Sequence, residues 1–294
     1  MKVAVVQMVS TPDVAQNLEC AQQLVEQASA HGAELVVLPE YFCGMGMQDT
    51  DKLAWAEVLG DGPVQQAMAA WAQRNAVWLV GGTVPIRGAQ PARVRNTCML
   101  FNPQGERAAY YDKIHLFRFA TETEHYDESA VIEAGHQPVV AQMVDRSGAA
   151  WKLGLSVCYD LRFPELYRQH VAQGAHILLA PAAFTYTTGQ AHWELLLRAR
   201  AVENQCWMLA AAQGGQHVNG RQTWGHSMVV DPWGQVLAQQ LEFFIELSFF
   251  GVIQFQLLIG EAGCFLYGFI IPSQGSKGGK LGCTGRSGHA WMLL

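Results

Sequence analysis

The residue with the clearest chemical potential in this sequence is Cys158, in the segment WKLGLSVCYDLRFPE. Residues 151–157 are apolar enough for a buried strand, and Pro164 stands where the first turn of a helix tolerates a residue without an N–H. A sharp strand-to-helix connection would expose the thiol and direct the following amides, starting with that of Tyr159, at the group that the sulfur attacks. The pattern therefore predicts a nucleophile. The alternative is that Cys158 is a small core residue, the usual fate of a free thiol.

Two charged residues occupy similar places, directly after apolar runs. Glu40 follows LVVLP, and Lys113 follows a run that ends at Asp112. Each has a simpler explanation, because a glutamate can cap a helix and a lysine is usually a solvated surface charge. The carboxyl ends of strands in α/β sheets meet at one crevice, so we expect the carboxylate, the ammonium and the thiol to lie together.

These three groups can hydrolyse an amide. A thiol with a pKa of about 8.5 is mostly protonated at neutral pH and needs a base, for which Glu40 is the candidate. Lys113 and the backbone N–H of Tyr159 would stabilise the oxyanion, and losing one such donor typically costs about 3 kcal/mol. Collapse would leave a thioester on Cys158, which water hydrolyses with Glu40 again as base. A second carboxylate, Glu128, would orient Lys113 or the water, although it could equally be an exposed loop residue.

Composition restricts the class of protein. The 294 residues are 50% hydrophobic and 15% charged, which predicts one large core and no extensive disorder. The formal net charge of −6 predicts neither nucleic-acid binding nor a basic membrane-facing surface. The seven cysteines lack the close spacing of a disulfide framework or a zinc site, so we expect a reducing cytoplasm, no metal and no cofactor. The first residues lead directly into an apolar run, so we expect no signal peptide.

Strand and helix patterns alternate along the first 240 residues. We expect helices, where apolar residues recur at helical spacing, over residues 14–31, 63–74, 164–173 and 192–204. We expect strands, as short apolar runs, over residues 3–7, 34–38, 77–84, 96–102, 108–111, 151–157, 176–180, 206–211, 223–230 and 236–239. The alternation predicts a layered α/β fold.

Three segments together resemble the signature segments of the nitrilase superfamily, the carbon-nitrogen hydrolases. They are LVVLPE around Glu40, YYDKIHLF around Lys113 and GLSVCYDLRFPE around Cys158. HWELLLRARAVENQCWMLAAAQ and WGHSMVVDPWGQVLA are similar to the same superfamily, so the resemblance runs from Met1 to about residue 240. It implies a four-layer αββα sandwich whose subunits form dimers or larger assemblies. It also implies the roles given above for the three residues, and a matching role for Glu128.

Within this superfamily the sequence most resembles amidases of deaminated glutathione and, next to them, ω-amidases acting on α-ketoglutaramate. We therefore expect a cofactor-free amidase that converts a small primary amide to a carboxylate and ammonia through a thioester on Cys158, with deaminated glutathione the favoured substrate. The alternatives are an ω-amidase, an acyltransferase whose thioester reacts with another amine, and a silent interaction protein inactivated by its altered C-terminus.

A 2-oxo acid substrate needs a cation near the pocket. Arg162 and Arg198 are the positive residues nearest the signature segments in sequence. Ion pairs with Glu165 or Glu194 are the simpler use of each, so the sequence leaves the substrate-binding residues unassigned.

The last 54 residues depart from the family pattern. We expect a carbon-nitrogen hydrolase domain over residues 1–240 and a tail over 241–294 that is apolar at first and glycine-rich later. Its longest uncharged apolar stretch, residues 247–260, has 14 residues, whereas roughly 20 are needed to span a bilayer, so we expect no membrane partner. The tail is either a divergent terminus packed on the sandwich, or the product of a shifted reading frame or an unspliced segment.

Overall fold

The computed structural model describes residues 1–90, 92–120, 125–240, 253–254, 256–259 and 265–268 of the chain. The chain divides into two compact units, Met1–Phe255 and Gln256–Leu294. The second unit contains one described feature, the antiparallel pair of β18 (Gln256–Ile259) and β19 (Phe265–Gly268). All other elements belong to the first unit.

Two sheets form the centre of the first unit. The strands of the first sheet are β1 (Lys2–Val5), β2 (Leu35–Val37), β3 (Trp78–Val80), β4 (Val84–Arg87), β5 (Val94–Phe101), β6 (Arg107–Asp112) and β17 (Ile253–Gln254). Their order is β17-β1-β2-β3-β5-β4, and β6 also pairs with β5. The strands of the second sheet are β9 (Val139–Val144), β10 (Ala150–Leu155), β11 (Ile177–Leu179), β12 (Trp207–Ala210), β15 (Met228–Val230) and β16 (Val236–Gln239). Their order is β16-β15-β12-β11-β10-β9.

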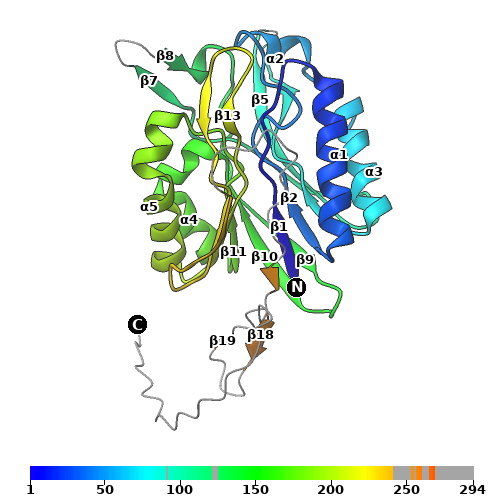
Figure 1. The fold of residues 1–294 in the computed structure, drawn as a ribbon, viewed down its shortest axis with the longest axis vertical. Helices are drawn as coiled ribbons and strands as arrows, with labels where there is room; N and C mark the ends of the chain where they lie inside the picture. The colour runs from blue at the N-terminus through cyan, green and yellow to red at the C-terminus, as the bar shows by residue number, and fades with distance from the viewer. Residues whose placement is uncertain (91, 121–124, 241–252, 255, 260–264, 269–294) are drawn as a thin grey trace, which may run out of the picture. The chain divides into compact units, whose positions relative to one another are not determined.

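Helices cover the outer face of each sheet. The four long helices are α1 (Val14–Ala30), α3 (Pro63–Asn75), α4 (Pro164–Ala172) and α5 (Tyr186–Asn204). In the first unit, α1 and α3 lie on one side of the paired sheets and α4 and α5 on the other (Figure 1). The layers are helix, sheet, sheet, helix, which confirms the four-layer αββα sandwich expected from the sequence.

Short elements connect these layers. They are α2 (Asp51–Ala54), the 3₁₀ turns η1 (Glu128–Ala130) and η2 (Cys158–Arg162), the hairpin of β7 (Arg118–Ala120) with β8 (His125–Asp127), and the hairpin of β13 (Gly214–Gln216) with β14 (Gln222–Trp224). The strand patterns of the sequence did not indicate β7, β8, β9 or β13.

The strand β1, in the first sheet, is buried on both faces. Ala4 packs in a cluster with Leu24 of α1 and Trp71 of α3. Val3 and Val5 point to the opposite face, because side chains alternate along a strand, and both are fully buried. A strand that is covered on both faces has a continuous apolar sequence, which is why VAVV has no polar alternation.

The expected elements are present, with some boundaries changed. The run 77–84 is divided between β3 and β4 around Gly82, where φ is +41° and a Cβ would lie 2.0 Å from Pro39 O. Glycine at this position lets the chain pass against the residue before Glu40. The run 223–230 is likewise divided between β14 and β15. The helix expected from residue 192 begins six residues earlier, at Tyr186, after Thr185, whose side chain accepts a hydrogen bond from the N–H of Thr188.

The predictions for the tail fall mostly on residues outside the described ranges. Of residues 241–294, the structure describes β17, which pairs antiparallel with β1, and the β18–β19 pair. The domain boundary after residue 240 therefore stays a prediction. Among the described residues, no helix combines the length and apolar character that crossing a membrane requires.

Candidate active site

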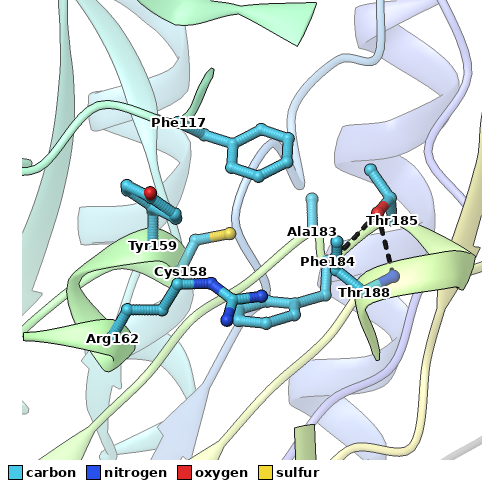
Figure 2. A pocket seen from close by; sticks show the side chains of 8 residues that line it. All are labelled: Phe117, Cys158, Tyr159, Arg162, Ala183, Phe184, Thr185 and Thr188. Atoms are coloured by element: carbon cyan, nitrogen blue, oxygen red, sulfur yellow. Dashed lines mark hydrogen bonds between the residues drawn. The ribbon is translucent and has the colours of Figure 1, made fainter. Parts of the chain in front are cut away.

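Cys158 lies at the sharp turn between β10 and α4. Its φ is +50°, a left-handed conformation that costs a non-glycine residue of order 1–3 kcal/mol. Its N–H donates to Pro181 O at 2.9 Å, which ties the turn to the segment that follows β11. Figure 2 shows its sulfur directed into a pocket, between Phe117 and Ala183. The structure has the strand-turn-helix geometry that the sequence predicted around this cysteine.

Asp160 fixes the turn that follows Cys158. Its buried carboxylate accepts hydrogen bonds from Val157 N at 2.9 Å, Tyr111 OH at 2.8 Å and His115 N at 3.0 Å. Val157 follows β10, whereas Tyr111 and His115 lie on either side of Lys113. Asp160 therefore connects two parts of the site that are distant in the sequence. Nothing in the sequence pattern distinguished it from other aspartates.

Lys113 lies between the two predicted carboxylates. Its Nζ donates to Glu40 Oε1 at 3.0 Å and to Glu128 Oε1 and Oε2 at 2.9 and 2.8 Å. Lys113 is fully buried, so the reading as a solvated surface charge is wrong. The Glu128 side chain is 13% exposed, so the exposed-loop reading is also wrong for that residue.

Glu40 is held by three donors from three segments. Besides Lys113, Asn96 Nδ2 donates to Oε1 at 2.8 Å and Ala183 N donates to Oε2 at 2.9 Å. Neither oxygen caps a helix, so that alternative is wrong. Tyr41, the next residue, has a φ of +57°, and its hydroxyl donates to Glu128 Oε1 at 2.8 Å. Sequence reasoning missed Asn96 and Tyr41, because neither residue type in those places is unusual.

The charges of the site follow from burial and pairing. Burial lowers the pKa of Lys113, but Glu128 and Glu40 raise the pKa by more, so the ammonium stays charged. Burial raises the pKa of Glu128, but Lys113 and neighbouring hydrogen-bond donors lower it by more, so this carboxyl group is ionised. Burial raises the pKa of the Cys158 thiol well above its ordinary value, and Glu40 raises it further while Lys113 opposes the shift. The resting thiol is therefore protonated and needs a base when it reacts.

Aromatic and hydroxyl side chains surround the sulfur. The residues that line the pocket are Phe117, Cys158, Tyr159, Arg162, Ala183, Phe184, Thr185 and Thr188 (Figure 2). The Tyr159 ring packs edge-on against Phe117, with 5.3 Å between ring centroids. The Tyr159 amide is among the first N–H groups of η2, which lack partners within the turn itself.

The two arginines considered from the sequence have different surroundings. Arg162 Nη2 donates to His192 Nδ1 at 3.2 Å, and its guanidinium lies over the Phe184 ring, 5.6 Å from the centroid. Among the described residues Arg162 forms no ion pair with Glu165, so that expected pairing is wrong. Arg198 forms the predicted ion pair with Glu194, at 3.4 Å, which confirms that expectation.

Within the described ranges, no group of three or more His, Cys, Asp or Glu side chains is arranged to hold a metal ion. The groups described above at this site are the thiol, the two carboxylates and the ammonium.

Comparison with known proteins agrees with this geometry. Residues 2–249 match the carbon-nitrogen hydrolase family. The chain is 43% identical over 237 residues to a protein of Synechocystis sp. (strain PCC 6803 / GT-S) named deaminated glutathione amidase, covering 80% of this chain and 85% of that protein. It is 41% identical over 241 residues to the Homo sapiens protein of the same name, covering 81% and 72%.

A solved structure is also similar. It is a variant of the amidase from Nesterenkonia sp. AN1 that shows the result of Michael addition of acrylamide at the active site cysteine. The identity is 30% and the TM-score 0.70, covering 86% of this chain and 91% of that one. This chain belongs to the carbon-nitrogen hydrolase family. It is accordingly a nitrilase-superfamily hydrolase that acts on amides, as the signature segments predicted.

Proposed function

We propose that this protein hydrolyses deaminated glutathione at an amide bond, through a thioester on Cys158. The observation that carries the proposal is the buried Lys113 Nζ, which lies within 3.0 Å of both Glu40 and Glu128 while all three charges act on the pKa of the Cys158 thiol. The names of the Synechocystis and human relatives support the choice of substrate.

In the proposed acylation step, Glu40 accepts the thiol proton while the Cys158 sulfur attacks the amide carbonyl carbon. The carbonyl oxygen becomes an anion, which Lys113 and the Tyr159 N–H stabilise. When this intermediate collapses, the C–N bond breaks and Glu40 returns the proton to the leaving nitrogen. The acyl group remains on sulfur as a thioester.

In the proposed deacylation step, Glu40 accepts a proton from water, and the resulting hydroxide attacks the thioester carbon. The same donors stabilise the second oxyanion. Collapse breaks the C–S bond, Glu40 returns its proton to the sulfur, and the product leaves as a carboxylate after its acid proton passes to solvent. Glu128 is a positioning residue in this scheme, because it touches Lys113 rather than the substrate.

The two candidate substrates differ in the group that leaves. Glutathione contains only secondary amides, so a deaminated derivative releases a peptide amine on hydrolysis. The primary amide of α-ketoglutaramate releases ammonia instead. The release of ammonia expected from the sequence therefore applies to the ω-amidase alternative, and each substrate needs its own product assay.

The experiment is to measure amine release from deaminated glutathione and ammonia release from α-ketoglutaramate. We expect wild-type turnover of the first, and none in the Cys158→Ala and Glu40→Gln variants, because each lacks a group that forms the thioester. Cys20→Ala, a change in α1, is the matched control, since Cys20 is a free and partly buried cysteine outside the site. Turnover of α-ketoglutaramate alone would favour the ω-amidase alternative.

A second measurement follows the reactivity of the thiol separately from turnover. Acrylamide treatment followed by peptide mass spectrometry should label Cys158 in the wild type, and labelling should be weaker in Glu40→Gln because thiol activation is lost. Turnover that persists in Cys158→Ala would refute the mechanism. Absence of both labelling and turnover in the wild type would favour the silent interaction protein.

We also propose that copies of this chain assemble through an exposed apolar face of α5. Leu195 and Val202, two turns apart on this helix, are 67% and 49% exposed, and Trp233 is 82% exposed. Arg198, between the two on α5, donates to Gly234 O at 2.8 Å, which brings Trp233 to the same region. Clustered apolar surface of this kind marks interfaces. Light scattering that gives a monomer mass for the wild type would contradict this, and Trp233→Asp should lower the mass of an oligomer.

We propose that the protein works in the cytoplasm. The five cysteines among the described residues are all free thiols, which supports a reducing compartment. Alkylation in unreduced cell extract should modify the more accessible Cys20. A disulfide recovered from such an extract would contradict the proposal.

A further inference from the structure

A second hollow, of about 480 Å³, adjoins the active site. Its lining residues are Tyr41, Gly44, Met45, Gly46, Met47, Gln48, Asp49, Lys52, Tyr126, Asn219, Gly220, Arg221 and Gln222. Two of them contact the residues of the catalytic pocket directly. The Tyr126 ring lies 5.9 Å from the Phe117 ring, and Arg221 Nη2 donates to Ala183 O at 3.0 Å. These contacts place Tyr126 and Arg221 in the wall between the hollow and the Cys158 pocket.

Arg221 belongs to this wall, and its hydrogen-bonding capacity is only partly used. The residue lies in the connection between β13 and β14, and its guanidinium lies over the Tyr126 ring at 5.1 Å. Its Nε is buried and has no hydrogen-bond partner among the described residues. A buried donor without an acceptor costs about 1–3 kcal/mol, so a ligand oxygen at this position would satisfy an unmet hydrogen bond.

The other charges in the hollow are already paired. Lys52 Nζ donates to Asp49 Oδ1 at 2.8 Å and lies over the Tyr41 ring at 5.0 Å. No carboxylate in the described part of the chain forms an ion pair with Arg221. Burial raises the pKa of Asp49, but Lys52 and, to a smaller extent, Arg221 lower it, so that the net shift is downward. Arg221 is therefore the cation in this hollow that is available to an anionic ligand.

We propose that Arg221 binds the 2-oxo acid carboxylate of the substrate and so determines which amides reach Cys158. This inference rests on the proposed function, because both candidate substrates carry that carboxylate a few carbon atoms from the scissile amide carbonyl. A guanidinium matches a carboxylate with two parallel hydrogen bonds, which a lysine ammonium cannot do. Substrate bound in this way has its charged end at Arg221 and its amide beyond Ala183, against the sulfur.

Arg162 is the competing cation, and its contacts argue against it. It lines the Cys158 pocket, but its guanidinium lies between the rings of Tyr159 and Phe184, at 5.9 and 5.6 Å, and binds His192. Arg162 also lines the pocket of the reacting sulfur itself, rather than the second hollow, where the far end of the substrate is proposed to bind.

The test compares a charged with a neutral amide. We measure kcat/KM for deaminated glutathione, whose acyl group carries the 2-oxo acid carboxylate, and for its pentanoyl analogue, whose acyl group has the same chain length and no charge. Arg221→Gln should lower the ratio of the charged to the neutral amide by roughly 10- to 100-fold, mainly through KM, as expected for loss of a charge-assisted hydrogen bond. Arg221→Lys should recover part of the ratio, and Arg74→Gln, which alters an exposed ion pair with Glu26, should leave it unchanged. An unchanged ratio in Arg221→Gln, or a fall of that size in Arg162→Gln instead, overturns the proposal.

A binding measurement keeps this inference separate from the proposed function. In the Cys158→Ala background, calorimetry with 2-oxoglutarate should show binding that Arg221→Gln weakens by the same factor. If the wild type hydrolyses no 2-oxo acid amide but this loss of binding is seen, the proposed function fails and the carboxylate site stands. If 2-oxoglutarate does not bind to Cys158→Ala, or binds equally well with Arg221→Gln, the carboxylate site is refuted.

Discussion

Replacing Glu128 by Gln tests whether the buried Lys113 charge depends on this carboxylate. Glu128 accepts from Lys113 Nζ at 2.9 and 2.8 Å, from Tyr41 OH at 2.8 Å and from Phe117 N at 2.7 Å. Glutamine has nearly the same shape, but it removes the negative charge and offers one acceptor oxygen in place of two. Lys113 would then share its charge with Glu40 alone, at 3.0 Å.

The expected cost is a large part of the protein's stability. Breaking a buried ion pair by removing one partner costs about 3–5 kcal/mol, because the other charge is left buried. We expect about 3 kcal/mol for Glu128→Gln, since Glu40 remains next to the ammonium and the glutamine oxygen still accepts one bond. For a domain of this size each kcal/mol lowers the melting temperature by roughly 2–4 °C, so the expected fall is about 6–12 °C.

Urea denaturation at pH 7 followed by circular dichroism measures this change. The control is Glu194→Gln, which removes the exposed ion pair with Arg198 and should alter the free energy of unfolding by less than about 0.5 kcal/mol. Adding Lys113→Met to Glu128→Gln should cost less than the sum of the two single changes, because the unpaired ammonium is then gone. The argument would be refuted if the free energies lost in the two single variants simply added in the double variant, or if Glu128→Gln lost less than about 1 kcal/mol. Either result would mean that leaving the Lys113 charge buried and unpaired costs little.

The acid side of the stability curve gives an independent check. The folded pKa of Glu128 is lowered, so its contribution is present above the ordinary glutamate pKa of about 4.3 and is lost as pH falls through the folded value. The folded pKa of Lys113 is raised, so its contribution is fully present below the ordinary lysine pKa of about 10.4 and adds no pH dependence in acid. The stability difference between wild type and Glu128→Gln should therefore stay constant near neutral pH and shrink below about pH 4. A difference that persists undiminished in strong acid contradicts this assignment.

Two further changes test residues that hold the site in place. Asn96→Ala removes the hydrogen bond from Nδ2 to Glu40 Oε1 at 2.8 Å, and we expect kcat to fall about tenfold with little change in KM, because the base is less well oriented. Steady-state kinetics measures this, and an unchanged kcat would show that Lys113 and Ala183 N hold Glu40 without help. Asp160→Asn leaves the donors around this buried carboxylate without enough acceptors, so we expect a loss of about 1–3 kcal/mol in thermal or urea denaturation together with a lower kcat. Wild-type stability in this variant would mean that the turn at Cys158 is held by other contacts.

Much of the fold could be predicted from the sequence because its elements are set by local patterns. The helix of residues 14–31 and the strand of residues 236–239 agree with α1 and β16 to within one residue, since apolar spacing and capping residues act over a few positions. Where the pattern failed, a tertiary contact had intervened. Gly82 divides the expected strand 77–84 because the chain must pass against Pro39 O, and no run of apolar residues contains that information.

The sequence by itself determined which side chains could take part in catalysis, and that each of them follows a strand. Glu40, Lys113 and Cys158 each come directly after an apolar run, and the carboxyl ends of strands in α/β folds meet at one crevice. The sequence did not show that Glu40 and Lys113 follow β2 and β6 of the first sheet, whereas Cys158 follows β10 of the second. Only the tertiary structure decided how close these side chains lie to one another and which residues form hydrogen bonds and ion pairs with them. Glu40 meets Asn96, 56 positions away, because β5 lies in the same sheet as β2, and it meets Ala183, 143 positions away, because the second sheet packs against the first. Arg221 is an ordinary loop residue in the sequence, and it becomes a candidate carboxylate site because folding buries its Nε against the active-site wall without an acceptor.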